Sequence, residues 1–256
     1  RWDVYVGSGF FTVSDLLVSS VFGYGARGEY RLGDVAVGGQ HLTTSMTGDG
    51  AELTSAYLEL GRTRSSRARL SLMDHRDRGT GAFAGGVEAY GVHESGVRVE
   101  GEYAVAAVPA IGEAYRIALA DTRSGFSYSL GALHADPGFI GQLDDLTRFE
   151  AAATASLGDA TSSAFSVSRS RSELDAALPT ATETCAVSLR HQATDSVSLA
   201  LGGRSVVAET DPDPESATDT SYAEARVRYA ADGLSMVFTG EVETSRVRTG
   251  ARNSTS

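Results

Sequence analysis

Short and longer connections take turns along this chain, and they separate segments in which apolar and polar residues alternate. The tight connections are rich in Gly, Asp and Ser, as turns require. They are Leu32–Val35, Thr63–Ser66, His93–Gly96, Thr122–Gly125, Leu157–Ala160, Ala193–Ser196 and Ala230–Gly233. Between them we expect longer connections around Met46–Gly50, His75–Gly79, Pro109–Gly112, Asp136–Asp145, Ser172–Glu183 and Glu209–Thr220. A soluble sandwich has no reason to sort its loops by length in this way.

The alternation within the segments has a period of two residues, which indicates β-strands. In Gly96–Val108, for example, Val99 and Tyr103 share one face, and Arg98 and Glu100 share the other. We expect about fifteen strands of roughly 9–13 residues, longer than the 5–6 residues usual in globular proteins and close to what a tilted strand needs to cross a bilayer. The alternation is blurred in Trp2–Ser20 and in Ala36–Leu42.

Tight turns on one side and longer loops on the other are the layout of a transmembrane β-barrel. The sequence therefore predicts an all-β fold, an antiparallel up-and-down transmembrane β-barrel of about 16 or more strands. A single domain over residues 1–256 is expected. The last alternating segment, Leu234–Val247, runs toward the longer loops and is followed by the polar stretch Arg248–Ser256, so we expect a further strand and an incomplete barrel in this chain.

The composition and net charge of the chain argue against several classes of binding partner and cofactor. The net charge is −11 and the pI is near 4.9, which argues against nucleic acid and anionic headgroups as main partners. No apolar run approaches the roughly 18 residues of a transmembrane helix. The single cysteine, Cys185, cannot form an internal disulfide, and no Cys/His spacing indicates a metal site. We therefore expect no metal and no cofactor.

The polar face of the strands is expected to line a water-filled lumen, where paired charges would set ion preference. The alternative is the solvated outer face of a soluble sheet. The charged residues assigned to the lumen are Arg27, Glu29, Arg31, Arg98, Glu100, Glu102, Arg116, Glu150, Arg169, Arg190, Glu224, Arg226, Arg228, Glu241 and Glu243.

The apolar face is expected to contact lipid, with aromatic residues near the strand ends forming a girdle at the headgroup level. The alternative is that these are ordinary strand-favouring aromatics. The residues assigned to lipid are Phe22, Tyr24, Tyr30, Tyr103, Tyr115, Ile117, Leu119, Phe126, Tyr128, Leu130, Phe149, Val187, Leu189, Leu199, Tyr229, Leu234, Met236 and Phe238.

Three polar motifs admit a second interpretation. Asp74 and His75 could activate a water at a barrel rim, but a polar loop tip is the favoured interpretation and no catalytic residue is predicted. The acidic stretch Glu209–Glu215 could bind Ca²⁺ or be a solvated loop. The loop that begins at Asp136–Phe139 could fold inward as a constriction or cap the outer rim.

On this pattern, which covers nearly the whole chain, the sequence resembles bacterial outer-membrane β-barrels of the porin-like class. Asp136–Phe139 and Gly86–Gly91 also look similar to barrel modules of very large bacterial surface proteins. The resemblance implies the outer membrane of a Gram-negative-type bacterium, a lipid-bilayer partner and a passive aqueous pore for ions and small hydrophilic solutes. The alternative is a structural barrel with a plugged lumen that anchors or exports a larger surface protein or joins an envelope assembly. Three further possibilities stay open: that the chain forms a homo-oligomer, that it is an enzyme with its site at the barrel rim, and that it is a soluble β-protein.

Overall fold

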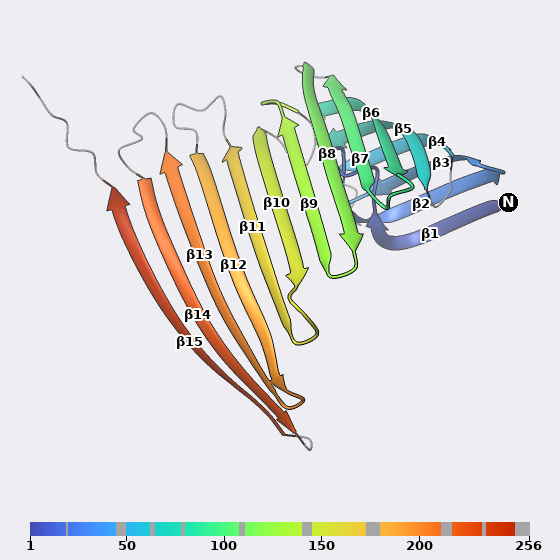
Figure 1. The fold of residues 1–256 in the computed structure, drawn as a ribbon. Coiled ribbons are helices and arrows are strands. Elements are labelled where there is room, and N and C mark those ends of the chain that lie inside the picture. The colour runs from blue at the N-terminus through green and yellow to red at the C-terminus, as the bar shows by residue number, and fades with distance from the viewer. Residues whose placement is uncertain are drawn as a thin grey trace, which may run out of the picture. The chain divides into compact units, whose positions relative to one another are not determined.

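The computed structural model describes residues 1–18, 20–44, 50–61, 65–77, 80–107, 111–139, 145–172, 180–210, 217–231 and 234–248. Fifteen β-strands run through these residues in one sheet, and their order in the sheet is their order in the chain (Figure 1). Their bounds are β1 Trp2–Phe11, β2 Val21–Leu32, β3 Val35–Thr43, β4 Glu52–Leu60, β5 Ser66–Asp77, β6 Thr80–Val92, β7 Arg98–Ala107, β8 Ile111–Arg123, β9 Phe126–Ala135, β10 Leu146–Ser156, β11 Thr161–Ser172, β12 Thr180–Thr194, β13 Val197–Thr210, β14 Ala217–Ala231 and β15 Leu234–Arg248. The predicted all-β, antiparallel up-and-down arrangement is confirmed.

All seven tight connections fall between consecutive strands, although Thr63, Arg64, Asp232 and Gly233 lie outside the described residues. The turn between β2 and β3 shows why the sequence fits. Gly33 has a φ of +59°, in the left-handed region that glycine enters without a steric penalty. Gly125, between β8 and β9, has a φ of +77° for the same reason. These turns fix the register of each hairpin, so that side chains in the same phase along neighbouring strands share one face of the sheet.

The predictions of longer connections around His75–Gly79 and Pro109–Gly112 are wrong. β5 continues through His75 to Asp77 and β6 begins at Thr80, and β8 begins at Ile111 directly after the short connection from β7. His75, Arg76 and Asp77 are polar, but they keep pairing with Ala82, Gly81 and Thr80, because exposed polar side chains do not end a strand when its backbone still has a partner. The connections from β3 to β4 and from β9 to β10 are longer, as expected.

The sheet is not closed among the described strands. β1 pairs with β2 alone and β15 pairs with β14 alone, and the expected sixteenth strand is not among the described residues. No helix that could span a membrane occurs in the part of the chain that the structure describes.

Two compact units divide the chain. The first unit comprises Arg1–Leu119 and Leu133–Leu146, and the second comprises Ala120–Ala132 and Thr147–Ser256. All of the buried apolar side chains among the described residues belong to the first unit. All of them except Ala36 form one cluster, which lies against a single face of the strands that we call the inner face. The cluster consists of Phe11, Val13, Leu16, Leu17, Val18, Leu42, Leu53, Met73, Ala84, Ala104, Ala106, Ala114, Ala135 and Phe139.

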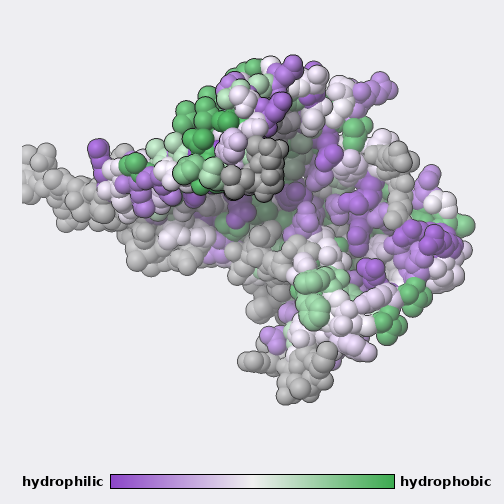
Figure 2. Space-filling model, turned by 90° about the horizontal axis from the view of Figure 1, so that it is seen from below, coloured by the Kyte–Doolittle hydropathy of each residue, from purple (hydrophilic) through white to green (hydrophobic). Residues whose placement is uncertain are grey.

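In the second unit the strands keep the same alternation without an apolar cluster among the described residues. Its apolar face carries rows of directly opposed side chains, such as Phe165 with Val187 and Val227 with Phe238. Its other face, which we call the polar face, carries Ser188 opposite Gly202 and Arg226 opposite Thr239. Figure 2 shows hydrophilic residues gathered in purple areas and hydrophobic residues in separate green patches.

Candidate functional site

The inner face of the first unit is divided into two bands along the strands. Next to the tight turns it carries charged and aromatic residues, such as Glu29 on β2 and Arg69 on β5. Next to the other connections it carries apolar or small residues, such as Leu42 on β3 and Met73 on β5, which are both almost fully buried. The inner face was expected to be polar along its whole length, so the apolar band was not anticipated.

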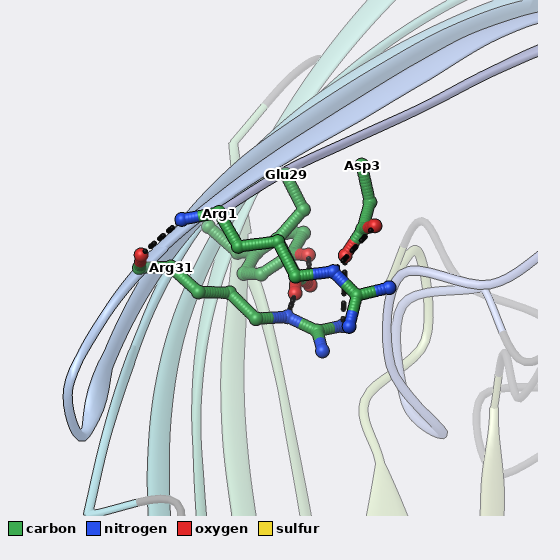
Figure 3. A network of polar contacts seen from close by, with 5 residues as sticks. Arg1, Asp3, Glu29 and Arg31 are labelled. Atoms are coloured by element: carbon green, nitrogen blue, oxygen red, sulfur yellow. Dashed lines mark hydrogen bonds and ion pairs between the residues drawn. The ribbon is translucent and has the colours of Figure 1, made fainter.

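The charged band begins with a network between β1 and β2 (Figure 3). Asp3 lies directly opposite Glu29 in the sheet, a placement in which two carboxylates would repel each other. Arg31 offsets this repulsion, because its Nε donates to Glu29 and its Nη2 lies 3.9 Å from Asp3 Oδ2. Arg1 Nε donates to Asp3 Oδ1 at 3.2 Å. Both carboxylates are therefore held by arginines, Arg31 of β2 and Arg1, which directly precedes β1.

Two further arginines of this band stack on tyrosine rings. The guanidinium of Arg69 lies 3.9 Å from the ring centroid of Tyr57, and that of Arg27 lies 5.5 Å from the centroid of Tyr5. Tyr57 is fixed, because its hydroxyl donates to Glu29. Gly38 makes room for this ring, since a Cβ at that position would lie 2.4 Å from it. The close approach of Tyr57 therefore depends on a glycine at position 38.

Around these groups lies a cavity of about 560 Å³ in the first unit. Its charged lining consists of Asp3, Arg27, Glu29, Arg31 and Arg69, an excess of one positive charge in a chain whose net charge is −11. A second cavity, of about 330 Å³, has more carboxylates than arginines. There Arg116 Nη1 lies 2.9 Å from Asp15 and 3.5 Å from Glu100, and Arg67 pairs with Glu88. The two cavities therefore differ in the sign of their charge.

The apolar band is covered by the segment that follows β1. Leu16 and Leu17 have no exposed surface, and Val13 N donates to Val18 O at 2.9 Å, which folds the segment into a tight turn. Leu16 N donates to Glu102 Oε1 on β7 at 3.1 Å, so this carboxylate satisfies a backbone group of the segment. Gln40 Nε2 on β3 donates to Thr12 O at 3.1 Å. We call residues 12–18 the inward segment.

The connection after β9 also covers this band. Phe139 is 2% exposed and belongs to the apolar cluster, so the described part of Asp136–Phe139 folds inward rather than capping the rim. Asp136 accepts a hydrogen bond from Glu113 N at 3.0 Å, and Phe139 N donates to Asp136 O at 3.1 Å. At Gly112 a Cβ would lie 2.9 Å from the backbone of Phe139, so this glycine permits the close approach.

The structure places most residues assigned to the lumen on one side of their strands. In the first unit Arg27, Glu29, Arg31, Arg98, Glu100, Glu102 and Arg116 share the inner face. In the second unit Arg190, Glu224, Arg226, Arg228, Glu241 and Glu243 share the polar face, and the side chain of Glu150 lies where a Cβ at Gly131 would be 2.9 Å from it. Arg226 Nη2 lies 2.8 Å from Glu224 Oε1. Glu102 differs from the rest because it is 6% exposed and lies beneath the inward segment.

Arg169 does not follow this pattern. β11 pairs with β12 without a register break, so Arg169 lies on the face of Phe165 and Val167, opposite Glu183. It was assigned to the polar face although its odd number puts it in phase with the apolar residues. Its position near the loop end of β11 lets it stay exposed beside an opposite charge.

The residues assigned to lipid share one face of the sheet, opposite to the inner face of the first unit and to the polar face of the second. Among them, the side chain of Leu234 lies outside the described residues. The exposed ones are Phe22, Tyr24, Tyr103, Tyr115, Ile117, Phe126, Leu130, Phe149, Val187, Leu189, Leu199, Tyr229, Met236 and Phe238. Tyr30, Leu119 and Tyr128 are partly covered, and Tyr30 stacks against Trp2 with ring centroids 4.6 Å apart.

Asp74 and His75 do not form a pair. They are consecutive residues within β5, so their side chains point to opposite faces of the sheet. Asp74 instead pairs with Arg76 at 3.0 Å. No group of three potential metal-ligating side chains comes together in the described residues. Most of the acidic stretch Glu209–Glu215 lies outside them.

Several residues of the charged band were not singled out from the sequence, chiefly Asp3, Tyr5, Tyr57, Arg67 and Arg69. For the two arginines a signal was present, since Arg67 and Arg69 alternate with Ala68 and Leu70. Comparison with protein-family models, curated proteins and solved structures finds no match to this chain.

Proposed function

We propose that this chain forms all or most of the wall of a transmembrane β-barrel in the outer membrane of a Gram-negative-type bacterium. In water the exposed face would leave large side chains such as Phe238, 64% exposed, and Val187, 59% exposed, in contact with solvent. Rows of such side chains exceed what a soluble monomer normally exposes, and a bilayer would cover them. The strands, of 9–15 residues, are long enough to cross it.

We further propose that the barrel is a passive pore for ions and small hydrophilic solutes. The observation that carries this proposal is the polar face of the second unit, where Glu224, Arg226 and Arg228 are exposed and no apolar cluster covers them among the described residues. Small neighbours such as Ala200 and Gly202 leave room for water beside these charges. Ion preference would then follow from the lumen charges.

A structural barrel with a plugged lumen is the second candidate, and a specific observation favours it. The inward segment and Phe139 fill the apolar band of the first unit, with Leu16 and Leu17 completely buried. Such a filled interior suits a barrel that anchors or exports a larger surface protein, or that joins an envelope assembly. The two candidates differ in whether the intact protein conducts ions.

Single-channel recording in a planar bilayer separates them. The expected result for a pore is a steady ohmic conductance, whose reversal potential in a salt gradient shifts toward cation preference in R226Q/R228Q. V227A is the matched control, because Val227 lies between the two arginines and faces the other way, so its selectivity should equal that of the parent. A barrel that inserts without conducting would refute the pore and support the structural role.

A further inference from the structure

The larger cavity of the first unit contains two arginines that form no ion pair with a described carboxylate. Arg27 stacks on the ring of Tyr5 and Arg69 on that of Tyr57. Arg69 also lies directly opposite Glu59 and Glu88 in the sheet and borders the smaller cavity, but it makes no ion pair with either glutamate. Arg69 Nε is buried and has no hydrogen-bond partner. A buried donor without an acceptor is unfavourable, so an acceptor supplied from outside would be bound there.

The carboxylates in the cavity cannot take that role. Glu29 accepts from both Arg31 and the Tyr57 hydroxyl, and Asp3 is held by Arg1 and Arg31. These contacts leave the Arg69 and Arg27 guanidiniums as the available donors of the lining. The tyrosine beneath Arg69 is itself fixed by Glu29 and fits over Gly38, so the guanidinium rests on an ordered support.

We propose that this cavity binds a small oxyanion, a carboxylate or a phosphate group carried by a hydrophilic solute. A guanidinium presents its N–H groups in a planar fork that matches the oxygens of either group. Arg69 supplies a half-buried fork, and Arg27 supplies a second positive charge. The volume of about 560 Å³ is that of a small-molecule site.

The site depends on the geometry of the first unit and not on conduction, so its test is independent of the pore. Isothermal titration calorimetry of the intact, detergent-folded protein would use sodium phosphate and sodium succinate, each against sodium chloride of equal ionic strength. We expect saturable binding of one of these oxyanions. Binding of phosphate alone or of succinate alone would identify which oxyanion the site takes.

Variants locate the site. R69Q is expected to weaken binding by about tenfold or more, the effect of losing one charge-assisted hydrogen bond. R69K keeps the charge and loses the fork, so it should bind more weakly than the parent and more tightly than R69Q. R190Q, on the polar face of the second unit, should bind like the parent. Fluorescence of the single tryptophan, Trp2, reports whether each variant is folded.

Two outcomes would overturn the proposal. One is a folded parent protein that binds neither phosphate nor succinate above the chloride control. The other is binding that survives unchanged in both R69Q and R27Q, because it would then occur elsewhere on the protein. A conducting protein without oxyanion binding would leave the pore intact and remove only this site.

Discussion

A single arginine placed on either side of β12 would report which face of the sheet contacts lipid. Val187 is the central residue of this strand and is 59% exposed, while Ser188 next to it faces the opposite way. Ser188 lies between Ala164 on β11 and Gly202 on β13, so an arginine there has room to extend. V187R and S188R therefore make the same change one residue apart on opposite faces.

The expected difference follows from the depth of Val187 in the bilayer. A strand that rises about 3.3 Å per residue and is tilted by about 40° changes depth by roughly 2.5 Å per residue. The centre of β12 would then lie near the bilayer midplane, where an arginine on the lipid face costs about 2–4 kcal/mol. L189R, about 5 Å from that depth, should cost less than V187R. S188R, on the polar face, should cost less than about 1 kcal/mol.

The assay is reversible urea unfolding of the protein in lipid vesicles, followed by Trp2 fluorescence. Trp2 is the single tryptophan and is 71% exposed on the apolar face of β1, so its emission should shift to shorter wavelength when the strand enters lipid. The free energy of unfolding of each variant is compared with that of the parent. Equal costs for V187R and S188R, or a larger cost for S188R, would refute the assignment of the apolar face to lipid.

Three further predictions use the same vesicle system. L17A should lower the free energy of unfolding by about 2–5 kcal/mol, because Leu17 is fully buried in the apolar cluster; a loss below about 1 kcal/mol would show that the inward segment does not pack as described. G25A should cost about 1–3 kcal/mol, since its Cβ would lie 2.0 Å from His41 O, whereas G101A has open space and should be close to neutral, and equal effects would contradict the close β2–β3 approach. Cys185, exposed on the apolar face, should react with a charged maleimide in urea and be protected in vesicles; equal rates would place it in water.

The sequence was sufficient for the strands and their faces because a period of two residues is a local signal. Each tight turn fixes the register of one hairpin, and the apolar residues then fall on one side without knowledge of distant contacts. The pairing of Val227 with Phe238 across the last hairpin is an example. Arg169 was misassigned by residue type, although the phase of Phe165 and Val167 in the same strand gives its face.

The site was less accessible from the sequence because it depends on neighbours that are distant along the chain. Arg69 and Tyr57 stack across the β4–β5 hairpin, and the ring of Tyr57 is fixed by Glu29, which comes from β2. The fit of that ring over Gly38 is likewise visible only when β3 and β4 are paired. The inward segment was missed for a related reason, because a short stretch without clear alternation has no local pattern that shows where it packs.

The inward segment does have a cause in the sequence, and it lies in the strands that the segment covers. In the first unit the inner residues change from charged to apolar within several strands, as from Arg69 to Met73 on β5 and from Glu102 to Ala106 on β7. An apolar half on a lumen face would be exposed to water, so it requires a cover, and Leu16 and Leu17 provide one. In the second unit Ser188 and Arg226 occupy the polar face without such an apolar half, and no described segment folds over them. The order of polar and apolar side chains along one face of a strand therefore indicates which part of that face another segment covers and which part stays open to solvent.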